Sequence, residues 1–181
     1  METISRTIRH DEVLGLEAFC LQGYAQPFPK HFHDYYVLGF VVSGERELIC
    51  NGLNLKLSPD HLLIFNPRDN HECVSASRAP FLHYLGFNIL KKRMEEISME
   101  LTGESCLPQF KPTVFSDESA CNAFLELHRL IMQRSDVLRK EELFYVLFSR
   151  LCGKYTHTSL QSRPLRSSQI KEACEYLESH S

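Results

Sequence analysis

Two histidines separated by one residue form a pair that could bind a metal or a ligand. His31 and His33 lie in a segment rich in residues that favour strands, and side chains two positions apart on a strand point to the same face. Tyr35 joins them if the strand continues, whereas Asp34 and Tyr36 point the other way. Neutral imidazole binds transition metals and also exchanges hydrogen bonds near pH 7. The pattern therefore predicts part of a metal site or the polar lining of a pocket.

The strands that must position these side chains are short and separated by turns. Asn51 and Gly52 form the strongest hairpin signal, because both tolerate the positive φ of a type I′ turn. We predict strands over residues 16–24, 30–42, 45–50, 53–57, 61–65, 71–75 and 81–89. Many short antiparallel strands joined by tight turns indicate a sandwich or a barrel. Segment 35–42 is apolar on both faces, so we expect helices to cover its outer side.

Helical periodicity replaces the strand pattern after residue 89. Residues 91–101 predict a short charged helix, a second helix begins after Ser116, and a third runs from near Val137 to about Cys152. The run 143–148 leaves the third helix little polar surface. One side of this helical hairpin is expected to pack on the barrel and the other on a second copy of the chain. The candidate dimer contacts are Leu127, Ile131, Phe144 and Leu147.

The end of the sequence predicts a linker and the start of another domain. Residues 156–167 are polar and interrupted by Pro164, as is typical of linkers. Residues 168–181 then predict a helix whose apolar stripe has no core of its own to pack against.

Composition excludes several classes of protein. With 181 residues, 43% hydrophobic and 24% charged, the chain has the composition of one globular domain with some extra length. Its formal net charge of −3 argues against holding nucleic acid by charge alone. The longest apolar run, 35–42, is far shorter than the roughly 20 residues that cross a bilayer, and residues 1–30 lack a signal-peptide pattern. We expect a cytoplasmic protein without membrane contact, whose seven unclustered cysteines are free thiols.

Several stretches, taken in order, resemble the AraC/XylS family of bacterial transcription regulators. They are residues 31–44, 57–67 followed by His71, 83–87 and 170–177. The resemblance implies a mostly β fold with added helices, in which a cupin-like antiparallel β-barrel of the jelly-roll type precedes a helical dimerisation hairpin. The implied divisions are an N-terminal arm (1–12), the barrel (13–90), the dimerisation region (91–155), the linker (156–167) and the start of a helix-turn-helix DNA-binding domain (168–181).

The resemblance adds two histidines to the candidate site. His71 stands where cupins place their third metal histidine, so His31, His33 and His71 would form an open site for Fe(II), Ni(II) or Zn(II). Cupin enzymes usually add a glutamate about four residues past the second histidine, and apolar residues occupy that place here. A three-histidine site without it occurs in thiol dioxygenases, so a metal-dependent cupin oxygenase is the alternative function.

We expect a pocket for a small effector, with no metal, no cofactor and no enzymatic activity. The ligand-binding candidates are His31, His33, Tyr35, His71 and His83. His83 is included because members of the family place a pocket histidine on the last strand; a surface position on an edge strand is the other interpretation. The implied partners are the effector, a second copy of the chain and promoter DNA.

The resemblance also implies a way to couple the pocket to the rest of the protein. An arm that contains Arg6, Arg9 and His10 can fold over the pocket, or it can be an ordinary frayed terminus. Effector binding would then favour one arrangement of arm, helices and linker. A dimerisation module with a degenerate, tightly packed barrel is a third possibility.

Overall fold

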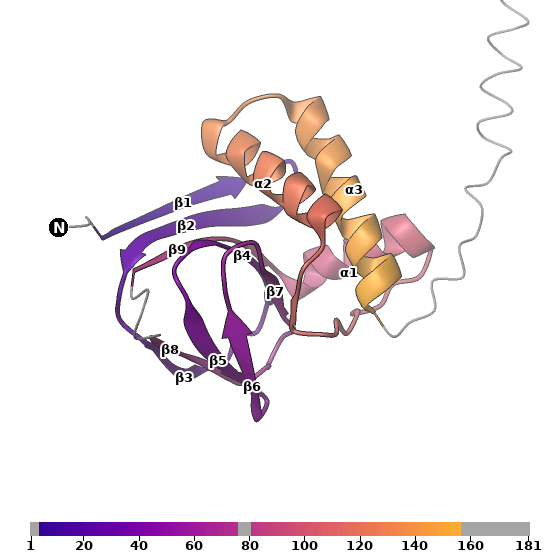
Figure 1. Ribbon diagram of the computed structural model, residues 1–181. Coiled ribbons are helices and arrows are strands. Elements are labelled where there is room, and N and C mark those ends of the chain that lie inside the picture. The colour runs from indigo at the N-terminus through magenta and orange to yellow at the C-terminus, as the bar shows by residue number, and fades with distance from the viewer. Residues whose placement is uncertain (1–3, 76–80, 157–181) are drawn as a thin grey trace, which may run out of the picture.

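The computed structural model describes residues 4–75 and 81–156, in which two β-sheets form a barrel beside three helices (Figure 1). The strands are β1 (Ser5–Asp11), β2 (Leu16–Tyr24), β3 (Phe28–His31), β4 (Tyr36–Ser43), β5 (Arg46–Cys50), β6 (Leu53–Leu57), β7 (Leu62–Phe65), β8 (His71–Ser75), β9 (Leu82–Ile89) and β10 (Val114–Phe115). The helices are α1 (Lys91–Thr102), α2 (Glu118–Gln133) and α3 (Val137–Tyr155). The predicted linker beyond Thr156 and the helix at 168–181 lie outside the described residues. No helix in the described ranges is long and apolar enough to cross a bilayer.

The two sheets have the antiparallel order of a cupin-like jelly roll. The larger sheet runs β1-β2-β9-β4-β7-β10, and the smaller runs β3-β8-β5-β6. The segment 30–42, predicted as one strand, is divided between β3 and β4. These strands belong to different sheets, so the chain must bend where it crosses from one to the other.

Turn residues set several of the strand boundaries. Asn51 and Gly52 both have positive φ, 49° and 82°, which confirms the predicted hairpin. Asp60 also has positive φ, 64°, at the turn before β7. Short polar side chains tolerate this conformation better than branched ones do, and the positions of the tight turns could therefore be read from residue type.

Strand β4 alternates between two cores, as its doubly apolar sequence predicts. Leu38 and Phe40 point toward the helices, and the Phe40 ring lies 5.9 Å from that of Phe124 in α2. Val37 and Val41 point into the barrel. Burial on both faces anchors this strand at the centre of the fold.

The N-terminal segment, expected as an arm that folds over the pocket or as a frayed terminus, is a paired strand. β1 pairs with β2 along its whole length at the edge of the larger sheet. Most of its side chains are exposed, so its sequence lacks an apolar alternation that would have predicted a strand. At its end, Asp11 forms a buried ion pair with Lys140 of α3, and Arg93 of α1 donates a hydrogen bond to the Leu14 carbonyl oxygen (2.8 Å). The β1–β2 turn is therefore held by two helices.

Helices α2 and α3 pack on the outer face of the larger sheet (Figure 1). The residues predicted as dimer contacts are at most 2% exposed and belong to this core: Leu127, Ile131, Phe144 and Leu147. The prediction for these four residues is wrong, because their side chains are already buried in the core that the helices share with the outer face of the sheet. The apolar side chains that α3 exposes are Val137, Leu138, Tyr145 and Val146.

Asp117 fastens the start of α2 to the end of α3. Its fully buried carboxylate accepts hydrogen bonds from the Ala120 amide (3.1 Å), Arg150 Nε (2.7 Å), Lys154 Nζ (2.9 Å) and the Tyr155 hydroxyl (2.9 Å). Burial alone would raise the pKa of this carboxyl, but the hydrogen bonds that it accepts hold the pKa well below its usual range. These hydrogen bonds and ion pairs thus hold the start of α2 and the end of α3 together.

Candidate functional site

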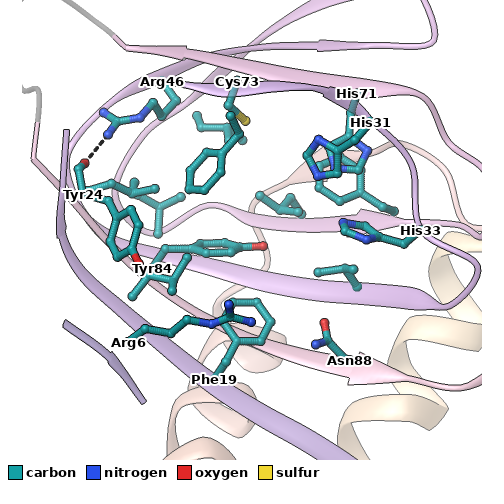
Figure 2. Close-up of a pocket in the computed structure, with 18 of the residues that line it drawn as sticks. Arg6, Phe19, Tyr24, His31, His33, Arg46, His71, Cys73, Tyr84 and Asn88 are labelled. Atoms are coloured by element: carbon teal, nitrogen blue, oxygen red, sulfur yellow. Dashed lines mark hydrogen bonds between the residues drawn. The ribbon is translucent and has the colours of Figure 1, made fainter. Parts of the chain in front are cut away.

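A cavity of about 260 Å³ lies inside the barrel, between the two sheets (Figure 2). Its wall is mostly apolar and aromatic, as in most small-molecule pockets. The polar groups in the wall are Arg6, His31, His33, Arg46, His71, Cys73 and Asn88, with the hydroxyls of three tyrosines. The barrel is therefore hollow, which argues against the third possibility of a degenerate, tightly packed interior.

Two glycines make room for aromatic rings on one wall of the cavity. Gly39 of β4 and Gly86 of β9 are paired directly opposite each other on neighbouring strands of the sheet. A β-carbon on Gly39 would lie 1.8 Å from the Tyr84 hydroxyl oxygen, and one on Gly86 would lie 2.1 Å from the Phe19 ring. Both rings therefore rest against the sheet backbone, with their centroids 5.6 Å apart. Larger side chains at either glycine would push a ring into the cavity.

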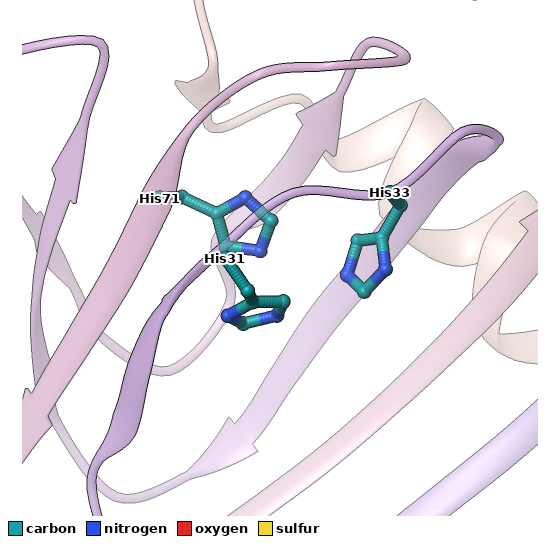
Figure 3. Close-up of side chains that lie close together, drawn as sticks. All are labelled: His31, His33 and His71. Carbon is teal, nitrogen blue, oxygen red and sulfur yellow. The ribbon is translucent and has the colours of Figure 1, made fainter.

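The three candidate histidines meet at one end of the cavity (Figures 2 and 3). Their ligand atoms all lie within 4.8 Å of one another. His31 ends β3 and pairs in register with His71, the first residue of β8, while His33 follows in the loop before β4. The predicted convergence of these three side chains is confirmed.

Backbone carbonyls fix the orientation of two of the rings. Nδ1 of His31 lies 2.6 Å from the Pro29 carbonyl oxygen, and Nδ1 of His71 lies 2.9 Å from that of Asp69. A carbonyl oxygen only accepts, so both Nδ1 atoms carry the hydrogen. The His71 ring also stacks on Phe65 with a centroid distance of 3.7 Å. The Nε2 lone pairs of His31 and His71 are left for a ligand.

Burial keeps two of the imidazoles neutral. Together with the neighbouring His71 and His31, which act in the same direction but less strongly, burial lowers the pKa of His33 to about 4. Burial also lowers the pKa of His71, although the hydrogen bond to the Asp69 carbonyl opposes the shift. His33 stacks on Tyr35 at 4.8 Å, and the Tyr35 side chain lines the cavity as predicted. At pH 7, His33 and His71 therefore offer uncharged nitrogen atoms at this end of the cavity.

His83 lies on the opposite side of its strand. Its neighbours Leu82 and Tyr84 line the cavity, so alternation along β9 turns His83 outward. There its Nε2 lies 3.6 Å from the Cys20 sulfur. The assignment of His83 to the cavity is wrong, because the resemblance indicated the strand without fixing which face the residue occupies.

Comparison with known proteins places the barrel and its helices in a family. Residues 15–148 match the profile described as the AraC-like ligand binding domain. The chain belongs to this family. A curated protein named "Uncharacterized HTH-type transcriptional regulator YbfI", from Bacillus subtilis (strain 168), is 40% identical over 181 residues. That match covers 99% of this chain and 66% of the relative, so the chain spans just under two thirds of the relative's length.

Solved structures similar to this AraC-like domain cover about half of the chain. KdgF from Halomonas sp. is 25% identical, with a TM-score of 0.41, over 48% of this chain and 78% of its own. An RmlC-like cupin family protein with a double-stranded β-helix fold, from Methanocaldococcus jannaschii, is 10% identical, also with a TM-score of 0.41, over 50% of this chain and 81% of its own.

The histidine cluster of this AraC-like domain also has the composition of a metal site. Three imidazole nitrogens, two of them oriented by second hydrogen bonds, suit Zn(II), Ni(II) or Fe(II). A metal held by His31, His33 and His71 would act as a Lewis acid on a molecule in the cavity. No carboxylate of residues 4–75 or 81–156 lines the cavity to complete such a site. The expected absence of a metal stays a prediction.

The arm residue Arg6 does reach the cavity, but from the paired strand β1, and two further polar residues of the wall were not predicted. Arg46 is fully buried and donates hydrogen bonds to two backbone carbonyls. Its position, two and four residues before the inward-facing Leu48 and Cys50, was the signal that could have found it. Asn88 carried no comparable signal.

Proposed function

We propose that the barrel cavity binds a small-molecule effector and that the chain is the ligand-sensing part of a transcription regulator. The observation that carries this proposal is the hollow, mostly apolar barrel with polar groups directed into it, in a domain of the AraC-like family. The name of the YbfI relative supports the regulatory role. The whole protein would be cytoplasmic and would bind promoter DNA through a helix-turn-helix domain.

Strand β1 connects the cavity to the helices in this proposal. Arg6 lines the cavity near the start of the strand, and Asp11 at its end pairs with Lys140 of α3. Because β1 pairs with β2 along its whole length, a displacement at Arg6 is transmitted along the strand. α3 ends at Tyr155, directly before the predicted linker. Effector binding would thus favour one position of α3 and of the linker that follows it.

A second connection runs through β2. The Phe19 ring lines the cavity, and the Phe19 carbonyl oxygen accepts a hydrogen bond from Nε2 of the buried His128 in α2 (2.9 Å). A ligand that moves this ring also acts on the hydrogen bond. Both helices of the hairpin therefore have a contact with an element of the cavity wall.

The side chains in the cavity suit binding better than catalysis. Burial raises the pKa of the Cys73 thiol to about 12, although Arg46 opposes the shift, so Cys73 is not a thiolate nucleophile at pH 7. Burial likewise raises the pKa of Tyr84 and keeps its hydroxyl protonated. No carboxylate in the described ranges lines the wall as a general base. We therefore propose a sensor without enzymatic activity.

We also propose that the chain forms a homodimer through the outer face of α3. Leu138 is 80% exposed and Val146 is 52% exposed, on a helix whose opposite face is fully buried. Exposed apolar side chains gathered on one helix are typical of an interface. Two copies of a helix face of this length can approach the area of about 1,200 Å² that stable complexes bury.

A thermal-shift screen of small metabolites, followed by calorimetric titration, tests effector binding. We expect at least one compound to stabilise the chain and to bind at least tenfold more weakly to His33→Gln. His83→Gln is the matched control, because this half-buried histidine of the same barrel faces away from the cavity. A compound that binds wild type and His33→Gln equally, but loses affinity in His83→Gln, would place the site elsewhere and contradict the proposal.

A further inference from the structure

The cavity wall carries two arginines and, among the described residues, no carboxylate. Arg6 and Arg46 carry only donors, and Arg46 uses two of its N–H groups on backbone carbonyl oxygens. The Tyr84 hydroxyl stays protonated in its buried setting. The amide of Asn88 uses its nitrogen on Glu17 (2.7 Å), which leaves its oxygen as an acceptor in addition to Nε2 of His31 and His71. A ligand that complements the arginine side of this wall must bring acceptors of its own, and negative charge suits the arginines best.

Arg6 brings a positive charge to the cavity that no salt bridge within the described ranges neutralises. Its guanidinium lies near enough to Tyr35 to affect the ionisation of that hydroxyl, and Tyr35 in turn stacks on His33. Arg6, Tyr35 and His33 therefore form one continuous polar side of the cavity. Glu17 is nearby, but it is bound to Asn88 and does not line the cavity.

The rest of the cavity is apolar. The rings of Phe19, Phe65 and Tyr84 and the side chains of Val41 and Leu63 make up much of its surface. Apolar walls favour an apolar ligand body, because burying it removes that surface from water. The volume of about 260 Å³ limits the ligand to a compact molecule.

From this arrangement we propose that the effector is a small organic carboxylate with an apolar body, whose carboxylate is bound by Arg6 beside the histidine cluster. The planar guanidinium of arginine matches a carboxylate with two parallel hydrogen bonds. A sugar fits less well, because it brings no negative charge to Arg6 and its hydroxyls would lie against a mostly apolar wall. This inference rests on the proposed function, because it names the chemical class of ligand for the same cavity.

Matched pairs of compounds test the inference without any variant. Phenylacetate and phenylacetamide, and hexanoate and hexanamide, have similar shapes but differ in charge; glucose serves as the neutral polyol. We expect calorimetric titration of wild type to give affinities at least tenfold higher for the carboxylates than for the amides, and no binding of glucose. Equal binding of carboxylate and amide, or tighter binding of glucose, would overturn the inference.

Variants of Arg6 identify the group that binds the charge. Arg6→Gln should lose at least tenfold in carboxylate affinity and should leave amide affinity unchanged, while Arg6→Lys should retain part of it. Arg129→Gln is the control, since this exposed arginine of α2 lies outside the cavity. Arg6 is itself exposed on an edge strand, so the variant should fold, as its circular dichroism spectrum will show. Unchanged carboxylate affinity in Arg6→Gln would also overturn the inference.

The outcomes separate this inference from the proposed function. If neutral compounds bind and lose affinity in His33→Gln, the ligand class is wrong and the effector site stands. If no compound of any class alters the melting temperature, the proposed function fails as well.

Discussion

Replacing Gly39 by alanine tests whether the Tyr84 ring limits the cavity. The new β-carbon would lie 1.8 Å from the Tyr84 hydroxyl oxygen, 2.3 Å from Cζ and 2.4 Å from Cε2. Favourable carbon contacts lie at roughly 3.5–4.0 Å, so the ring must retreat by about 1 Å or more. Strand β4 is buried on both faces and cannot move in its place. The ring must move into the cavity.

Overpacking of this kind costs roughly 1–3 kcal/mol of unfolding free energy. At about 2–4 °C per kcal/mol for a chain of this size, the melting temperature of Gly39→Ala should fall by roughly 2–12 °C. Carboxylate affinity should fall with it, because the displaced ring occupies the volume that the ligand body needs. Urea unfolding and calorimetric titration measure the two effects.

A double variant distinguishes this specific clash from general strain. Tyr84→Ala removes the ring that Gly39→Ala displaces, so the two destabilisations should sum to more than that of the double variant, by about 1–3 kcal/mol. Gly153→Ala in α3 is the control; alanine at this exposed helical position should stabilise by up to about 1 kcal/mol. Wild-type stability of Gly39→Ala, or strictly additive effects in the double variant, would refute the reasoning.

Three further predictions concern the buried Asp117 carboxylate, the dimer and the histidine cluster. Asp117→Asn should lower the unfolding free energy by roughly 1–3 kcal/mol at pH 7. Because the folded pKa of Asp117 is depressed, this stability is present above about pH 4 and is lost on further acidification, so the unfolding free energies of variant and wild type in urea should converge there. A difference that persists in acid would contradict the stabilising role of the Asp117 carboxylate. Leu138→Glu should convert a dimer to monomers in sedimentation velocity, whereas Leu53→Glu in the exposed β5–β6 hairpin should not; a dimer that survives Leu138→Glu would exclude the α3 face. Elemental analysis should find far less than one metal ion per purified chain, and stoichiometric zinc or iron that disappears in His71→Ala would overturn the expectation.

Sequence patterns predicted the parts of the fold that local chemistry determines. Positive φ at Asn51 and Gly52 follows from residue type, so the hairpin was placed correctly. The period-two spacing of His31 and His33 likewise determined their common face, and both now point into the cavity. β1 was missed because an exposed edge strand shows no apolar alternation.

The wrong predictions concern the packing partner or the strand face of a side chain, which a local sequence pattern does not determine. The apolar stripe that contains Leu127 and Phe144 predicts a buried helix face. The stripe does not determine whether that face packs on the same chain or on a second copy. His83 was placed on the correct strand and on the wrong face, since a shift of one residue reverses the side of the sheet. Arg6 reaches the cavity only because β1 closes onto β2, a pairing that depends on the whole barrel.

A methyl-selective NMR titration with the tightest-binding carboxylate tests the central claim, that the barrel cavity is the ligand site. We expect saturable shifts of the methyl resonances of Val41 and Leu63, which line the cavity. The methyl resonances of Leu53, which is 63% exposed at the tip of the β5–β6 hairpin, should not shift. Shifts confined to exposed methyl groups, with Val41 and Leu63 unchanged at saturation, would contradict the account.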